Sequence, residues 1–240
     1  MNFKIDESII KYPKDLSKNL ISKSILLPMW SQQLDENIKI NAVDIITADI
    51  FPGNRIGFFE ANINYTSNSH NDTSRIMMSG GSASIVVLIR CTQTNEIHTV
   101  LVRQPRIGSG QLIYEYPAGL TDDSTDFRLT AVRELEEECG IIASVDEVIN
   151  INDLVYEKNL KFYTNAQMFY EEASVFLVVK KMSLEEIKAI EGRNGGVDEE
   201  EQITLHVSLF NDVINLTPDP ATISITFLLQ KLIKEGKITI

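Results

Sequence analysis

Residues 119–141 read GLTDDSTDFRLTAVRELEEECGI, and the rest of the chain can be interpreted from this stretch. Asp126 or Thr125 can cap the start of a helix, because short polar side chains accept hydrogen bonds from the first free amides. Gly140 suits the position just after the last turn, where a left-handed conformation is common. These signals predict one helix that ends immediately before Gly140.

The predicted helix concentrates negative charge on one side. Glu134, Glu137 and Glu138 are three and four residues apart, which places their carboxylates within about 100° of one face. We expect the opposite face to pack into a core through Leu129, Val132, Leu135 and Cys139. Like charges at this spacing repel, whereas a hard divalent cation would bind them. A solvated acidic face is the alternative interpretation.

The order of residues in this stretch resembles the Nudix box, Gly-x5-Glu-x7-Arg-Glu-U-x-Glu-Glu-x-Gly-U, where U is aliphatic. The positions that match in register are Gly119, Arg133, Glu134, Leu135, Glu137, Glu138, Gly140 and Ile141. Thr125 stands where the family has its first glutamate. The resemblance implies a Nudix hydrolase, which is an α+β fold with a mixed β-sheet between helices.

Two flanking segments resemble one subgroup of that family. Gln104-Pro-Arg106 and Glu115-Tyr-Pro-Ala-Gly119 look like the corresponding segments of ADP-ribose and ADP-sugar pyrophosphatases. FPGNRIGFF at 51–59 and the Glu-Glu-x-Ser-Val-Phe pattern at 171–176 look like those of plant-type ADP-sugar diphosphatases. The resemblance implies Mg²⁺-dependent hydrolysis, with Mn²⁺ as an alternative, of ADP-ribose or ADP-glucose to AMP and a sugar phosphate.

The same resemblance implies roles for individual residues. The metal would be bound by Glu134, Glu137, Glu138 and the carbonyl of Ala118, with Glu137 also catalytic. Substrate would contact Arg106 and Glu115, and Arg133 and Gly119 would support the site. The alternative for Arg106 is a surface salt bridge, and the alternative for Glu115 is a structural role at a strand end. Trp30, Phe58 and Phe59 could stack on a base, although core or dimer packing is the interpretation we prefer.

A general base is implied in a late loop that precedes a strand. In ADP-ribose pyrophosphatases this base begins the pattern Glu-x-aliphatic-x-aliphatic, which Glu201-Gln-Ile-Thr-Leu205 fits. Glu201 is therefore the predicted catalytic base, and Glu199 and Glu200 are its rivals. The segment Asn194-Gly195-Gly196 would allow this loop to move over substrate.

The composition limits the other classes of function. A formal net charge of −12 and a pI near 4.7 argue against a basic nucleic-acid-binding surface. The cysteines at 91 and 139 form no CxxC motif and predict reduced core residues in a cytoplasmic protein. No run reaches the ~18 apolar residues of a membrane helix, and the first residues lack a signal-peptide core.

The patterning of the chain predicts two parts. Residues 1–75 form an N-terminal helix and β-rich element that we expect to join a homodimer, and residues 76–240 form the catalytic domain. In the first part we expect a helix over 13–25, strands within 38–66 and a loop over 66–73. In the second we expect strands at 84–89, 98–104, 152–156, 173–179 and 203–209, and helices after Ser183 and Asp219.

Two further hypotheses about function remain open. The chain could be a Nudix hydrolase of another diphosphate, such as a UDP-sugar, a dinucleotide or coenzyme A. It could also be a catalytically silent module that binds a nucleotide sugar as a sensor. The three intact helix glutamates disfavour the sensor, and Thr125 favours it.

Overall fold

The computed structural model describes residues 4–14, 16, 18–121, 126–156, 161–196 and 203–240. The chain divides into two compact units. The first contains Met1–Ser82, Leu120–Thr125 and Tyr163–Ala173, and the second contains Ala83–Gly119, Asp126–Phe162 and Ser174–Ile240. The strands β4, β7, β9 and β10 include residues of both units.

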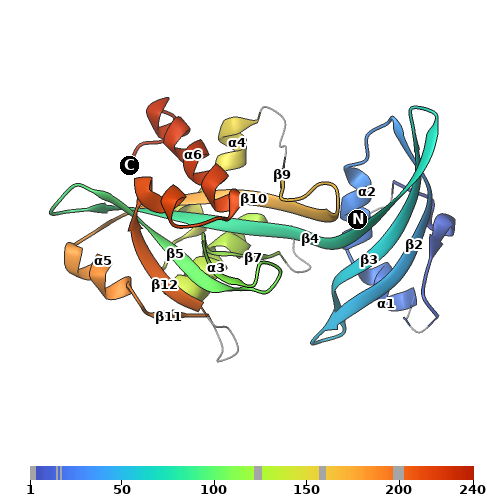
Figure 1. Ribbon diagram of the computed structural model, residues 1–240, viewed down its shortest axis with the longest axis horizontal. Helices are drawn as coiled ribbons and strands as arrows, with labels where there is room; N and C mark the ends of the chain where they lie inside the picture. Colours follow the sequence, from blue (N-terminus) through green and yellow to red (C-terminus); the bar gives the residue numbers. More distant parts are fainter. Residues whose placement is uncertain (1–3, 15, 17, 122–125, 157–160, 197–202) are drawn as a thin grey trace. The chain divides into compact units, whose positions relative to one another are not determined.

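The first unit is built on long antiparallel strands (Figure 1). Its elements are η1 (Glu7–Ile9), β1 (Ile10–Lys11), α1 (Lys18–Lys23), α2 (Leu26–Gln32), β2 (Ile38–Phe51), β3 (Arg55–Ser67) and the first part of β4 (His70–Cys91). β1 pairs in parallel with β2, and β3 pairs antiparallel with both β2 and β4. The turn predicted at residues 52–54 is confirmed, with positive φ angles of 81° at Gly53 and 59° at Asn54.

One prediction in this unit is wrong and another is only partly confirmed. The polar residues 66–73 form no long loop, because β3 and β4 continue to a tight hairpin whose turn is Asn68-Ser69. Both turn residues have positive φ angles, 49° and 65°, as the common two-residue hairpin turn requires at both of its central positions. The helix predicted over 13–25 is shorter, because α1 spans Lys18–Lys23, and a second helix that was not predicted, α2, begins at Leu26. The Ser24 hydroxyl between them accepts a hydrogen bond from the Leu26 amide.

The second unit has strands and helices in alternation. Its elements are the rest of β4 and the following, of which β7, β9 and β10 belong to it only in part: β5 (Ile97–Arg106), β6 (Gln111–Glu115), β7 (Ala118–Leu120), α3 (Phe127–Cys139), η2 (Val145–Glu147), β8 (Ile149–Asn150), α4 (Ile151–Val155), β9 (Phe162–Tyr163), β10 (Phe169–Met182), α5 (Leu184–Ile190), β11 (Asn194–Gly195), β12 (Ile203–Leu209), η3 (Phe210–Asn215) and α6 (Pro220–Lys234). β5 pairs antiparallel with β4, β6 and β12, and β12 pairs antiparallel with β11. β10 pairs with β4.

Helices cover both faces of this sheet. On one face, Leu88, Leu101 and Leu177 pack in one core with α4, η3 and α6. Because side chains alternate along a strand, the neighbouring residues face the other way, and there Arg128 of α3 lies over the ring of Phe176, 5.9 Å from its centroid. Figure 1 shows α4 and α6 on one side of β4 and β10 and α3 on the other. The predicted α+β fold is confirmed.

Capping signals predicted helix starts correctly, and four of the five strands predicted in the catalytic part are confirmed. The confirmed ranges are 84–89, 98–104, 173–179 and 203–209, within β4, β5, β10 and β12. Ser183 and Glu186 form the expected capping box at α5, and Asp219 caps α6 at Thr222 with Pro220 in its first turn. The strand predicted over 152–156 is wrong, because the Asn150 side chain accepts from the Asn152 amide and begins α4. Within the residues described, no helix has the length and apolar character needed to span a membrane.

Candidate functional site

The helix α3 has the ends that its sequence predicts. The Asp126 carboxylate accepts hydrogen bonds from the amides of Arg128 and Leu129, each over 3.1 Å. Gly140 follows the last turn with φ of 64°, and its amide donates to the Glu136 carbonyl over 2.8 Å. These caps fix which residues are helical and therefore which side chains share a face. Thr125, the other predicted cap, lies outside the described residues.

The burial of α3 differs from the prediction. Leu129, expected in the core, is 52% exposed, whereas Glu134 and Glu138 are only 9% and 7% exposed. Leu135 and Cys139 are buried as expected. The two carboxylates are buried because other parts of the second unit cover the acidic face, which helical periodicity alone cannot show. Buried charges need partners or a metal, so this pair is the centre of the candidate site.

Strand β7 supplies one of these covering segments. The Ala118 amide donates to Oε2 of Glu138 over 3.1 Å. A Cβ atom added to Gly119 would overlap the carboxylate of Glu134, so only glycine fits there without moving that side chain. The first two residues of β7 thus lie directly on the two buried carboxylates. Ala118 and Gly119 were predicted to bind metal and to support the site, and the structure brings them to it.

Arg133 lies between two of the helix glutamates. Its Nη2 is 2.6 Å from Oε1 of Glu134, and its Nη1 is 2.5 Å from Oε2 of Glu137. Planar guanidinium groups hold carboxylates in defined orientations, which suits the supporting role predicted for Arg133. Its role in function stays a prediction.

The helix glutamates provide the type of ligand atom that a divalent metal needs. Hard cations take oxygen ligands, and Glu134, Glu137 and Glu138 offer carboxylate oxygens on one helix against a close-packed backbone. Among the described residues, no group of three or more His, Cys, Asp or Glu side chains is close enough to hold a metal ion, so the three glutamates do not converge in this structure. The fit to a metal rests on donor type alone: carboxylate oxygens are the protein ligands that Mg²⁺ binds, and Mg²⁺ usually takes its other ligands from water and substrate.

Arg106 of β5 and Glu115 of β6 are not directly opposite in the strand pairing, but their side chains meet. Nε of Arg106 lies 2.9 Å from each carboxylate oxygen of Glu115, and Nη2 also contacts Oε2. This pairing raises the pKa of Arg106, and the charges of Glu138 and Asp219 add to the effect while burial opposes it. The charge of one helix glutamate, Glu138, therefore acts on Arg106.

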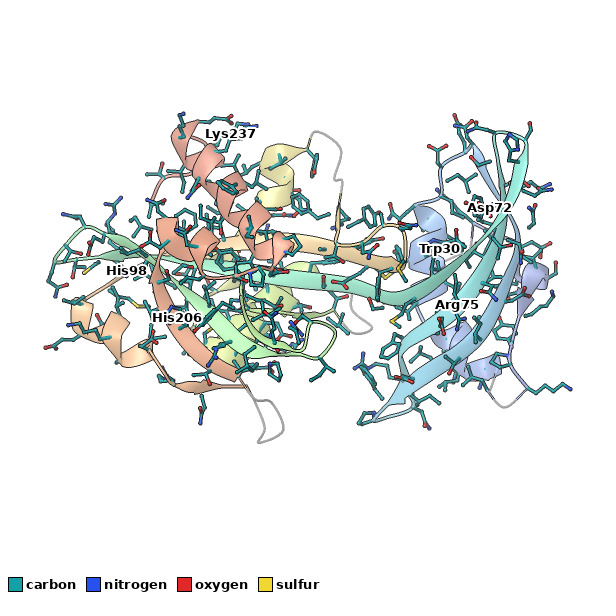
Figure 2. All side chains as sticks on the ribbon, viewed as in Figure 1. Trp30, Asp72, Arg75, His98, His206 and Lys237 are labelled. Atoms are coloured by element: carbon teal, nitrogen blue, oxygen red, sulfur yellow. The ribbon has the colours of Figure 1, made fainter. Side chains whose placement is uncertain are left out.

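Other candidates are placed differently. Glu201, Glu199 and Glu200 lie outside the described residues, so the predicted base is not located. Phe59 is fully buried and cannot stack on a base, and Phe58 packs edge-on against Phe51 at 6.3 Å. Trp30 is half-buried on α2 (Figure 2).

Two features of the site were missed from the sequence. Asp219 was interpreted only as a helix cap, yet its charge acts on Arg106. Asn194–Gly196 was interpreted as a hinge, but Asn194 and Gly195 pair with β12, and the Gly196 amide donates to the Glu137 carbonyl over 3.2 Å. The consecutive glycines Gly195 and Gly196 were the sequence signal for this contact, because glycine permits close approach of two backbones as well as movement.

Known proteins share this sequence pattern and fold. A family model described as the NUDIX domain matches residues 81–215. Nudix hydrolase 14, chloroplastic, from Arabidopsis thaliana is 29% identical over 240 residues, which cover 98% of this chain and 74% of that protein. Methanol dehydrogenase activator from Bacillus methanolicus is 30% identical over 173 residues, which cover 72% of this chain and 76% of that protein.

One solved structure gives an independent comparison of the fold. It is described as an ADP compounds hydrolase and superimposes with a TM-score of 0.57, covering 86% of this chain and 100% of the other. The two sequences are 17% identical, so the likeness concerns the fold alone.

Proposed function

Because the chain belongs to the Nudix hydrolase family, we propose that it hydrolyses the diphosphate bond of ADP-sugars such as ADP-ribose and ADP-glucose, giving AMP and a sugar phosphate. The family match includes α3 and its glutamates. Membership makes the chain an enzyme that acts on nucleoside diphosphate derivatives, generally with divalent metal ions. The ADP-sugar substrate, Mg²⁺ and the individual residue roles belong to the proposal.

One observation carries the proposal. Glu134 and Glu138 are buried carboxylates one helical turn apart, and the backbone of Ala118 and Gly119 lies against them. Burying two negative charges side by side is costly, and Arg133, which pairs with Glu134, compensates part of that cost. A divalent cation bound by both carboxylates would compensate it further. Glu134, Glu137 and Glu138, with the Ala118 carbonyl, would hold Mg²⁺, which neutralises diphosphate oxygens and lowers the pKa of a bound water.

The chain's own residues would orient the substrate around this centre. Arg106 presents a guanidinium that can donate to a phosphate oxygen in a bidentate manner, and Glu115 holds it in place. Arg133 fixes the orientation of Glu134 and Glu137 through its two ion pairs. Glu201 would accept the proton of the attacking water.

The choice of ADP rests on two supports. The segments around Arg106 and Glu115 resemble those of ADP-ribose and ADP-sugar pyrophosphatases, and the similar solved structure is described as an ADP compounds hydrolase. UDP-sugars, dinucleotides and coenzyme A are the competing substrates, and a silent sensor is the competing function. The homodimer formed through residues 1–75 and the cytoplasmic location stay predictions.

A product assay tests this proposal. The protein is incubated with Mg²⁺ and, separately, ADP-ribose, ADP-glucose, UDP-glucose, NADH, a diadenosine polyphosphate, coenzyme A and a nucleoside triphosphate. We expect AMP and a sugar phosphate from the ADP-sugars alone. If only another compound is hydrolysed, that compound is the substrate and the ADP-sugar assignment is wrong. Tight binding of one compound without hydrolysis would favour the sensor.

A further inference from the structure

The last turn of α3 is held from outside the helix by residues 193–196, which we call the α3 brace. The final four carbonyls of any α-helix lack partners within the helix. In α3 the Glu136 carbonyl is satisfied by the Gly140 amide, whereas the Glu137 carbonyl accepts from the Gly196 amide over 3.2 Å. A segment distant in sequence therefore completes the hydrogen bonding of a proposed metal ligand's own peptide group.

Gly195 makes the closest approach in the brace. A Cβ atom added there would overlap the backbone carbonyl oxygen of Glu138 and would lie 3.0 Å from Cγ2 of Ile203. A backbone atom cannot rotate away as a side chain can, so a larger residue must push the brace and α3 apart. Gly195 therefore permits a close packing that a larger residue would not.

The other side of the brace is fixed to β12. Asn194 pairs with Thr204 and Gly195 with Ile203, and the Arg193 carbonyl accepts from the Leu205 amide over 2.8 Å. The Arg193 guanidinium reaches Gly140, 2.9 Å from the position that a Cβ would take, beyond the helix C-terminus. A cation there suits the negative end of the helix dipole. The brace thus connects a sheet strand to the turn that carries Glu137 and Glu138.

We propose that Gly195 and Gly196 are positioning residues of the metal site, which fix the last turn of α3 so that Glu137 and Glu138 present their carboxylates together. This inference rests on the proposed function, because it assumes that these glutamates bind a metal. Gly195 and Gly196 touch no metal and act through the α3 backbone. Residues that orient metal ligands from outside typically contribute about 10- to 100-fold to metal affinity.

Isothermal titration of Mn²⁺ into the full-length wild type, Gly195→Ala and Gly108→Ala tests the inference. Gly108 is the matched control, because an added Cβ there meets nothing within 4 Å. We expect Gly195→Ala to bind Mn²⁺ about 10- to 100-fold more weakly, and Gly108→Ala to bind as the wild type does. Wild-type affinity in a folded Gly195→Ala protein would overturn the inference and leave the proposed function standing. Failure of the wild type to bind Mn²⁺ would overturn both.

A second measurement needs no variant, in case Gly195→Ala does not fold. Amide exchange of the wild type is followed by NMR with and without saturating Mg²⁺. If opening of the brace disturbs the metal site, Mg²⁺ binds the closed form more tightly and lowers the population of the open form. Because the Gly196 amide exchanges from the open form, Mg²⁺ should slow its exchange by about tenfold or more. The Gly236 amide, which donates to the Ile233 carbonyl at the end of α6, is the control and should not change. Equal Gly196 exchange rates with and without bound Mg²⁺ would contradict the inference.

Discussion

Arg106 and Glu115 form a bidentate ion pair across β5 and β6, and the same guanidinium feels the charges of Glu138 and Asp219. The pair could be a simple surface salt bridge, since the Arg106 side chain is half exposed. Its position within reach of Glu138 favours a role in the site. We propose that Glu115 holds Arg106 ready for a substrate phosphate, and the two variants below test this.

Arg106→Lys and Glu115→Gln should each raise KM for the ADP-sugar about 10- to 100-fold and change kcat less. Each change removes one charge-assisted interaction, which contributes roughly 1.5–3 kcal/mol. If Glu115 acts through Arg106, the effects will not add in the double variant. Steady-state kinetics of the four proteins measure this, and fully additive effects would show that the residues act independently.

Glu137→Gln should reduce turnover by several orders of magnitude while the protein stays folded. The substitution removes a carboxylate ligand but keeps the size of the side chain. It also breaks a partly exposed ion pair with Arg133, which contributes about 0.3–0.5 kcal/mol, so thermal unfolding should shift little. Glu136→Gln is the matched control, because Glu136 is exposed and has no proposed role. Near-normal activity of Glu137→Gln would remove Glu137 from the metal site.

Gly119→Ala should lower kcat about 100-fold, because the new methyl group must displace the Glu134 carboxylate. Gly108→Ala introduces the same methyl group where there is open space, and should be fully active. Single-turnover kinetics at saturating Mg²⁺ distinguish a misplaced ligand from weak metal binding. Full activity of Gly119→Ala would show that Glu134 can move without loss.

Glu201→Gln should lower kcat about 10²- to 10⁴-fold with a smaller change in KM, as expected for loss of a general base. Glu199→Gln and Glu200→Gln are the matched controls in the same acidic segment. If Glu200→Gln loses turnover and Glu201→Gln does not, the predicted alignment of this segment is wrong by one residue.

The sequence predicted best what depends on neighbouring residues. The caps at Asp126, Ser183 and Asp219 each act within three residues, so the starts of α3, α5 and α6 were predicted correctly. A short apolar segment fits a strand or a helix equally well, and the strand predicted over 152–156 is wrong because Asn150 caps α4 there.

The candidate site was only partly predictable, because part of it depends on contacts between residues that are distant in sequence. The three glutamates follow from helical spacing, but the segments that contact the carboxylates of Glu134 and Glu138, Ala118 and Gly119, are distant in sequence. Helical periodicity placed Leu129 inside, and the structure leaves it exposed. Tertiary packing decides which side of such an imperfectly amphipathic helix is covered.

The central claim is that the α3 glutamates form a metal-dependent active site for ADP-sugar hydrolysis. Its most direct test is AMP release from ADP-ribose by the wild type and by Glu134→Gln, with Mg²⁺ and after chelation by EDTA. The account predicts one AMP and one ribose phosphate per substrate from the wild type, loss of activity with EDTA, recovery with Mg²⁺, and near-complete loss in Glu134→Gln. Equal turnover by the wild type and Glu134→Gln, or turnover that resists EDTA, would contradict it.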